Sequence, residues 1–307
     1  MQTFFRLGLA AVLLLSPLRV LRAQDLTPRA YVITPTHSNA VTLSYSFFSG
    51  SIDFNGALPI NDARGKYSIP NFSYYHSFGI FGRSANIVAS LPYGVGNFRG
   101  TESGVERNLY RSGLTDSIYR LSVNLKGGPA MPPKEFVKWH QKMLLGVGLK
   151  VIAPTGQYDP KKLINWGANR WSFKPELGYS QRWGKWVLDG YAGAWFFTTN
   201  HHFFPGKLTN SQKPMVAFEG HLSHDFKPRL WVSLDGNLWY GGSTSLEGIE
   251  NPLTNQRNSR LGATAAVPVS KHQSLKFGYS SSTYIRFGGK YQTVSVAWQY
   301  GWLGRPN

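Results

Sequence analysis

The sequence predicts an all-β fold, a transmembrane antiparallel up-and-down β-barrel of about twelve strands with both termini in the periplasm. Three observations support this prediction: segments of about ten residues in which apolar and polar side chains alternate, connections that are alternately short and long, and a composition rich in aromatic residues but without long apolar runs. In such a barrel the apolar side chains face lipid and the polar side chains face the lumen.

The first residues have the three-part layout of a secretory signal peptide. A short basic region over 1–6 precedes an unbroken apolar core over 7–15, Pro17 ends this core, and Ala23 offers a small residue for cleavage. An uncleaved N-terminal helix is the alternative, although the core is too short to cross a bilayer. We expect four parts along the chain: a signal peptide over 1–23, a periplasmic lead-in over 24–38, the barrel over 39–302 and a C-terminal tail over 303–307.

Composition narrows the possible classes of protein. No stretch after residue 23 approaches 18 uncharged apolar residues, which argues against membrane-spanning helices. The chain has no Cys, which excludes a disulfide scaffold and thiolate chemistry. Aromatic residues make up 15% of the chain, including 10 Trp, and suit aromatic girdles at the two membrane interfaces. A soluble β-sandwich or lectin is the alternative all-β fold.

The chain is strongly basic, with 33 Lys and Arg against 15 Asp and Glu. Basic residues often bind nucleic acid, but they are scattered here and no nucleic-acid motif accompanies them. We therefore expect no nucleic-acid partner. The predicted location is the outer membrane of a Gram-negative cell, and the predicted partners are outer-membrane lipid, lipopolysaccharide and a small-molecule solute. The pattern does not predict an oligomeric state.

Twelve segments carry the period-2 alternation of strands. They are 39–48, 68–78, 84–93, 114–125, 139–152, 170–182, 185–198, 214–226, 229–241, 258–268, 272–283 and 291–302. The connections at 183–184, 227–228 and 268–271 are short, whereas those at 49–67, 94–113, 153–169, 199–213 and 242–257 are long. Bacterial barrels have this asymmetry, with long loops outside the cell and short periplasmic turns.

Several segments resemble the outer-membrane family labelled "putative MetA-pathway of phenol degradation". The resemblance rests on VIAPTGQYDP (151–160), LINWGANRWSFKPELGYS (163–180), LDGYAGAWFFTTN (188–200), GHLSHDF (220–226), WVSLDGNLWYGG (231–242) and AAVPVSKHQSLKFGYSSS (265–282). It covers roughly residues 25–302. The resemblance implies a transporter-like barrel, often encoded with aromatic-compound pathways, and implies no catalytic residues. Many outer-membrane barrels end on an aromatic residue, whereas here Trp302 is followed by a five-residue tail.

The strand alternation also predicts which polar side chains line the lumen. These residues are Lys142, Lys150, Lys174, Glu176, Arg182, Glu219, His221, Ser223, Asp225, Asp235, Arg260 and Lys276. They would form either a charged constriction that selects solutes or a structural ion-pair network that closes a narrow barrel. Both interpretations stay open, because a twelve-stranded barrel is intermediate in width.

Two other chemistries are weaker candidates. His221 and Ser223 have the His-x-Ser spacing of an outer-membrane lipid hydrolase, yet the alternation turns both toward the lumen and not toward lipid. His201 and His202 lie in a loop without the spacing of a metal site. We therefore predict no metal, no cofactor and no enzymatic activity.

The tryptophans near strand ends complete the pattern. Trp171, Trp186, Trp298 and Trp302 are expected to be interface anchors, as are Trp195, Trp231 and Trp239, although the last three would also suit an inward, solute-stacking role. The predicted function is a passive pore or transporter for small compounds, aromatic or hydrophobic. The alternatives are a lipid hydrolase using Ser223 and His221, and a closed structural or adhesive barrel.

Overall fold

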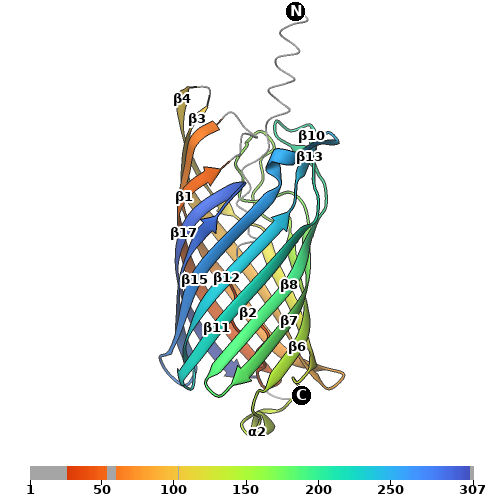
Figure 1. The fold of residues 1–307 in the computed structure, drawn as a ribbon, viewed down its shortest axis with the longest axis vertical. Coiled ribbons are helices and arrows are strands. Elements are labelled where there is room, and N and C mark those ends of the chain that lie inside the picture. The colour runs from red at the N-terminus through yellow and green to blue at the C-terminus, as the bar shows by residue number, and fades with distance from the viewer. Residues whose placement is uncertain (1–25, 54–59, 103, 305–307) are drawn as a thin grey trace, which may run out of the picture.

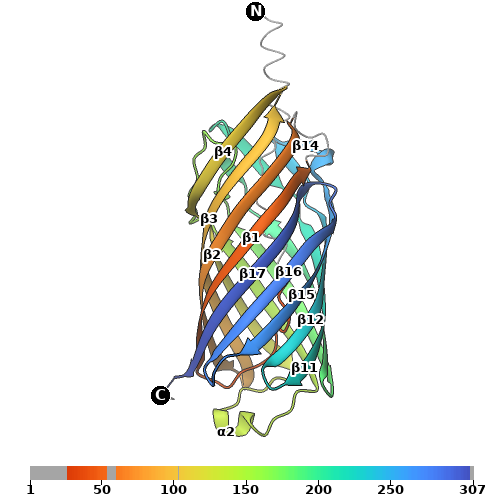
Figure 2. The same cartoon turned by 90° about the vertical axis from the view of Figure 1, so that its left-hand side faces the viewer.

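The computed structural model describes residues 26–53, 60–102 and 104–304, which form a closed antiparallel β-barrel with twelve strand positions (Figures 1 and 2). The barrel strands are β1 (Ser38–Asp53), β2 (Ile60–Ile80), β3 (Arg83–Glu102), β4 (Val105–Leu114), β5 (Ser117–Lys126), β6 (Met143–Ala153), β7 (Ser172–Trp183), β8 (Trp186–Phe197), β11 (Met215–Lys227), β12 (Leu230–Gly241), β15 (Gln256–Pro268), β16 (Gln273–Tyr284) and β17 (Gly288–Leu303). β4 and β5 pair with successive parts of β3 and share one position. The predicted strand number is therefore confirmed.

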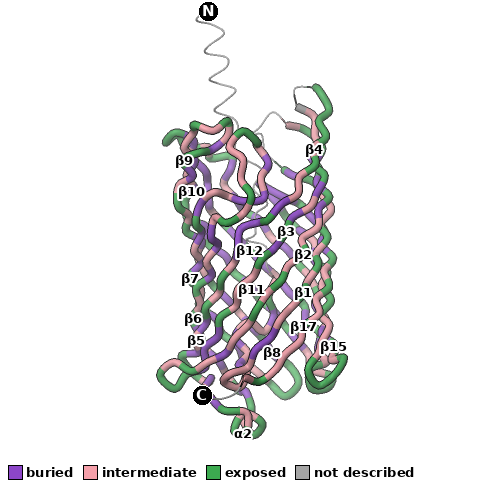
Figure 3. Tube along the Cα trace, turned by 180° about the vertical axis from the view of Figure 1, so that it is seen from behind, coloured by how far each residue is buried: buried purple, intermediate pink, exposed green. Residues whose placement is uncertain are grey.

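Burial alternates along the strands as the sequence predicts (Figure 3). In β11, Ala217, Glu219 and His221 are buried on the inner face, while Val216 and Phe218 are exposed on the outer face. Exposed apolar side chains recur on the outer faces of the other barrel strands, from Leu43 on β1 to Val296 on β17. Successive side chains of a strand point to opposite faces, so this pattern gives an apolar outer band that matches a hydrocarbon layer. By its fold and outer surface, the chain is an outer-membrane barrel.

The first three strands are longer than the sequence suggests. β1, β2 and β3 have 16, 21 and 20 residues, so most of the predicted loops 49–67 and 94–113 are strand. Those loops were predicted wrongly because their glycines resemble turn signals. A Cβ on Gly94 would lie 2.3 Å from the Trp166 ring, and one on Gly96 would lie 2.4 Å from Tyr67 Cβ. These glycines make room for aromatic side chains inside the barrel.

The two ends of the barrel differ. The end with the short connections 81–82, 184–185, 228–229 and 269–272 also carries the short helix α2 (Pro133–Phe136), and we call it the turn end. At the opposite, loop end, a small sheet is formed by β9 (Asn200–Phe203), β10 (Leu208–Gln212), β13 (Thr244–Leu246) and β14 (Ile249–Asn251), followed by the 3₁₀ turn η2 (Pro252–Thr254). Among the described residues, no helix is long and apolar enough to cross a membrane.

The first and last strands close the barrel. β1 and β17 are paired over sixteen consecutive positions, from Ser38 opposite Leu303 to Asp53 opposite Gly288. The barrel strands therefore extend from Ser38 to Leu303. Residues of the predicted signal peptide, and the last three residues of the predicted tail, lie outside the described residues.

Candidate functional site in the barrel interior

A network of charged side chains crosses one half of the barrel interior. Lys174 on β7 contacts two carboxylates, with Nζ 2.6 Å from Glu176 Oε2 and 3.1 Å from Glu219 Oε1. On β11 and β12, His221 Nδ1 donates to Asp235 Oδ1 at 2.8 Å. Asp235 also accepts hydrogen bonds from Ser233 and Thr264. All five charged residues lie on inner faces, and the alternation of the strands therefore brings them together.

The segment 26–37 lies inside the barrel, which the sequence analysis did not foresee. Arg29 Nη1 is 2.7 Å from Asp225 Oδ1, and the backbone N–H of Arg29 donates to Asp189 Oδ2 at 3.2 Å. Thr27 donates to Glu219 Oε2 at 3.2 Å, and Tyr31 donates to Glu176 Oε1 at 3.1 Å. The segment therefore occupies part of the lumen and supplies donors to four wall carboxylates, Glu176, Asp189, Glu219 and Asp225. The periplasmic location of the N-terminal end of this segment stays a prediction.

Tyr31 holds this segment against the wall. Its side chain is fully buried, and its ring lies over glycines of β6 and β7. A Cβ added to Gly146 or Gly178 would lie 2.6 or 2.1 Å from the ring. Arg120 on β5 also packs on the ring, with its guanidinium carbon 4.8 Å from the ring centroid. The inner wall thus contains a recess shaped for one aromatic side chain.

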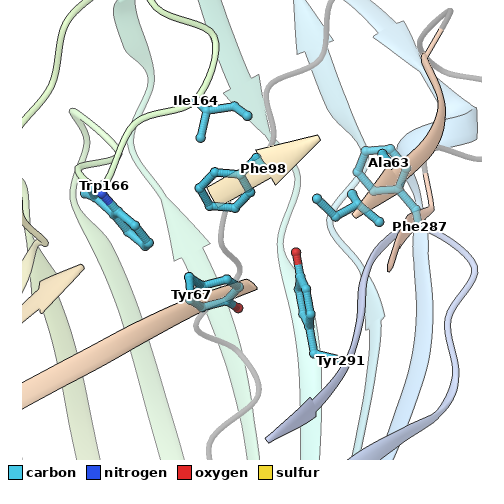
Figure 4. Close-up of a cluster of buried hydrophobic side chains, with 8 residues drawn as sticks. Ala63, Tyr67, Phe98, Ile164, Trp166, Phe287 and Tyr291 are labelled. Atoms are coloured by element: carbon cyan, nitrogen blue, oxygen red, sulfur yellow. The ribbon is translucent and has the colours of Figure 1, made fainter. Parts of the chain in front are cut away.

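An aromatic cluster narrows the lumen near the loop end (Figure 4). Tyr67, Phe98 and Tyr291 come from three barrel strands, while Ile164 and Trp166 reach in from the connection between β6 and β7. The Tyr67 ring lies 5.9 Å from Trp166 and 5.2 Å from Tyr291, both edge-on. Offset and edge-on contacts at these distances are favourable for aromatic pairs, so the cluster is a packed apolar constriction.

A cavity of about 1770 Å³ occupies the rest of the interior and reaches from the turn end to this cluster. Its uncharged wall includes Ile69, Val88 and Ile118, and it ends at Tyr67 and Trp166. Its charged lining contains nine basic residues and one acidic residue, Asp225. The basic residues are Arg29, Arg120, Arg182, Arg229, Lys150, Lys185, Lys227, Lys271 and Lys276. The cavity therefore combines an uncharged wall of apolar and small polar side chains with an excess of positive charge.

The other predicted lumen residues are distributed around this arrangement. Arg182 Nη1 is 2.7 Å from Asp225 Oδ2, so Asp225 is shared by two arginines. Arg260 is buried and donates to the hydroxyls of Ser280, Thr293 and Ser282. Lys150 is buried on the inner face of β6, and Lys276 lines the cavity.

Lys142 differs from the prediction, because it is exposed and precedes the first residue of β6. The regular pairing starts at Met143, so the alternation no longer sets the direction of Lys142.

Four residues that sequence reasoning missed complete the site. Asp189 and Arg120 lie on inner faces, and the alternation within their strands would have found them. Arg29 and Tyr31 carry no such signal, because their segment has no period-2 pattern. Only the interior carboxylates and glycines that they contact explain their position.

The tryptophans separate into two groups. Trp171 and Trp186 are exposed on the outer face, as expected of interface anchors. Trp195, Trp231 and Trp239 are buried inside, so the anchor prediction was wrong for them. Trp239 Nε1 donates to Gln256 at 2.8 Å, which satisfies its polar group within the barrel.

The His221 and Ser223 pair lacks the contact of a nucleophile and its base. Both side chains are buried on the inner face of β11, and among the described residues neither His221 Nε2 nor Ser223 Oγ has a hydrogen-bond partner. His221 Nδ1 bonds Asp235, while Nε2 lies 3.7 Å from Glu219 Oε2. The imidazole therefore bridges two carboxylates, which is the geometry of a structural ion-pair network.

The loops at the loop end are ordered by their own polar contacts. Lys213 Nζ lies 2.6 Å from Glu250 Oε2, and Ser243 donates to Glu250 Oε1 at 2.6 Å. The hydrogen bond from Lys213, and after it that from Ser243, keep the pKa of Glu250 below its usual range. Asn200 Nδ2 donates to the Tyr158 hydroxyl at 2.9 Å, which joins β9 to the connection that carries Trp166.

Solved structures with this fold are outer-membrane barrels. The COG4313 outer membrane channel from Pseudomonas putida F1 has a TM-score of 0.74 at 15% identity, covering 91% of this chain and 100% of that one. The transport unit of the autotransporter AIDA-I from Escherichia coli has a TM-score of 0.51 at 11% identity, covering 97% and 98%. At these identities the likeness shows the fold alone. No curated protein matches the sequence.

A family model matches residues 38–296, the span from the first residue of β1 to the interior of β17. This span contains the twelve strand positions, the charged network, the aromatic cluster and the predicted lumen residues. The chain therefore belongs to the family described as "Putative MetA-pathway of phenol degradation".

Proposed function

We propose that this chain is an outer-membrane channel that lets small aromatic or hydrophobic compounds cross passively. The main support for the proposal is the cavity, which extends from the turn end to the aromatic cluster and has an uncharged wall along its length. An apolar solute would exchange water for this wall and for the rings of Tyr67 and Trp166. The protein would supply a lined passage and no covalent chemistry.

The family description mentions phenol degradation, and this supports aromatic compounds as the first solutes to test. The hydrolase alternative receives less support, because Ser223 Oγ has no hydrogen bond to a base. The charged network at Lys174 and Glu219 supports a rigid wall rather than an open selectivity filter, since its ions are paired with one another.

The test is single-channel conductance of the refolded protein in a planar bilayer, with and without phenol. We expect small, stable steps of single-channel conductance. Phenol should reduce the size of these steps, because it would occupy the end of the cavity at the aromatic cluster. Trp166→Ala should enlarge the step and weaken the reduction, whereas the control Trp171→Ala, which changes an outward-facing tryptophan, should leave both unchanged. Folded protein that gives no conductance in both wild type and Trp166→Ala would contradict the proposal.

Lipopolysaccharide is the proposed lipid partner. Arg64 on β2 and Arg99 on β3 are directly opposite each other, and both are exposed on the outer face at the loop end. Lys66 lies on the same face. Lys290 on β17 is two strands from Arg64, because Ser51 on β1 lies opposite both residues. Like charges opposite one another destabilise a strand pair, so a phosphate between them would relieve the repulsion.

A further inference from the structure

The interior cations outnumber the carboxylates that can pair with them, and this imbalance is concentrated around Trp231. The Arg29 guanidinium carbon lies 4.4 Å from the centroid of the Trp231 ring, and Lys276 Nζ lies 5.8 Å from it. Two cations therefore share one buried aromatic ring. Their mutual repulsion in a partly desolvated place is unfavourable unless an anion lies between them.

Two of the three carboxylates nearby are fully engaged, while the third, Asp189, accepts the backbone N–H of Arg29 at Oδ2 and has a buried Oδ1 without a donor among the described residues. Asp225 is contacted by both Arg29 and Arg182. Asp235 accepts hydrogen bonds from His221, Ser233 and Thr264. Within the described part of the chain, no Asp or Glu lies within ion-pair distance of Lys276, and Arg29 Nε and Nη2 are buried donors without an acceptor. The Nε–Nη2 edge of a guanidinium is one of the edges that hold a carboxylate through two hydrogen bonds.

The cavity continues from these cations along an uncharged path, on which Phe48, Ile69 and Val88 lie among serine and asparagine side chains. Lys276 and Trp231 both line it, and it ends at Tyr67 and Trp166. Lys276 is opposite Ala297 on β17, and Tyr291 of the aromatic cluster lies six residues further along the same strand. Six residues of β-strand span about 20 Å. The cations and the aromatic cluster are therefore far enough apart for the head of an amphiphile to lie at the cations while its tail extends toward the cluster.

We propose that the cavity binds amphiphilic carboxylates, with the carboxylate between Arg29 and Lys276 and the apolar body along β1, β2 and β3 toward Tyr67 and Trp166. This names a ligand class within the proposed channel function and rests on it. A carboxylate would satisfy the free edge of Arg29 and the ammonium of Lys276 together. A neutral compound of the same shape would leave both groups without an acceptor, and a cationic one would be repelled.

The test measures equilibrium binding by titration calorimetry to the full-length refolded protein in non-ionic detergent at pH 8. The probes are decanoate, decanol and decylamine, which share one apolar chain and differ in the charge of the head. We expect decanoate to bind about tenfold more tightly than decanol, a ratio that corresponds to about 1.4 kcal/mol. Decylamine should bind most weakly.

Matched variants assign the effect to the site. Lys276→Gln should bring decanoate to within about twofold of decanol. Lys207→Gln, which changes an exposed lysine in a loop, should keep the full preference. Circular dichroism and heat-modified gel mobility would show that both variants are folded.

Each other result overturns the proposal. Equal binding of decanoate and decanol would show that the charge of the head does not contribute to affinity. An unchanged preference in Lys276→Gln would show that the carboxylate does not bind at Lys276. Failure to bind any of the three would show that the cavity is not a ligand site. Because binding is measured in detergent, it is separate from conductance: a protein that conducts but does not prefer the carboxylate keeps the channel function and loses this ligand class.

Discussion

Tyr31 is fixed inside the barrel because glycines stand where other residues would carry a Cβ. Gly178→Ala would place a methyl group 2.1 Å from the Tyr31 ring, and overpacking of this kind costs about 1–3 kcal/mol. We expect the variant to release the segment 26–37, so that limited proteolysis cuts there faster while the barrel stays intact. Gly220→Ala is the matched control, because nothing lies within 4 Å of a Cβ added at that strand position. Equal cleavage of the two variants would contradict the role of the glycine recess.

Asp235 and Ser223 should differ sharply in their contribution to stability. Asp235→Ala removes the acceptor of three hydrogen bonds and leaves His221 with one distant carboxylate, so the free energy of unfolding should fall by about 3–5 kcal/mol. Ser223→Ala removes a hydroxyl without a partner and should change it by less than about 0.5 kcal/mol. Urea unfolding followed by tryptophan fluorescence measures both. Lipid hydrolysis that is present in wild type and lost in Ser223→Ala would instead favour the hydrolase.

At the scale of whole elements, the interior segment should limit conductance. Deleting residues 26–35 removes Arg29, Tyr31 and their contacts but leaves β1, which begins at Ser38. We expect a several-fold larger single-channel step from a barrel of unchanged circular dichroism. A second variant, in which Gly and Ser replace the same residues, keeps the segment but removes its contacts with the barrel wall. Its single-channel conductance should fluctuate between the wild-type value and that of the deletion variant. A step of wild-type size in the deletion variant would show that the aromatic cluster alone limits the flow.

The outer cations of β2 and β3 make a second prediction at this scale. Replacing Arg64 and Arg99 together by Gln should weaken binding of purified lipopolysaccharide by about tenfold, because two phosphate contacts are lost. The barrel should be slightly more stable in detergent without lipopolysaccharide, since the opposed like charges are gone. Co-purified lipopolysaccharide, quantified per barrel, measures the first effect. Unchanged binding would assign the lipid contact to another face.

The strands were more predictable from sequence than the interior segment. Val216 and Phe218 alternate with Ala217 and Glu219, and this local pattern was sufficient to place β11 and its inner face. Arg29 is positioned by Asp189 and Asp225, which are more than 150 residues away in sequence. No local periodicity encodes such contacts, so the segment was interpreted as a lead-in. Trp195 and Trp239 did carry a local signal, because each lies an even number of residues from Asp189 or Asp235, the inner-face aspartate of its own strand. They were assigned to the membrane interface because tryptophan is enriched there, whereas they pack inside.

For the molecule as a whole, the distribution of charge should set the preferred ion. The cavity lining contains nine basic residues and one acidic residue, and the entire chain has a formal net charge of +18. We expect the channel to pass chloride roughly threefold more readily than potassium at 0.1 M salt, and the preference to shrink at 1 M, where screening is stronger. The reversal potential across a KCl gradient measures this ratio. Lys271→Glu should reduce it, and a potential that favours potassium in wild type would contradict the charge argument.

The sixteen paired positions between β1 and β17 join residues that are about as far apart in sequence as the barrel allows. β17 is the last strand of the chain, so the barrel cannot close until β17 has reached the membrane and paired with β1. Until then both β1 and the newest strand present unpaired edges, which in other chains would recruit neighbours. Contacts this distant in sequence form slowly. The barrel is therefore expected to mature in a late, all-or-none closing event, and a truncation that removes β17 should leave an aggregating sheet and not a smaller pore.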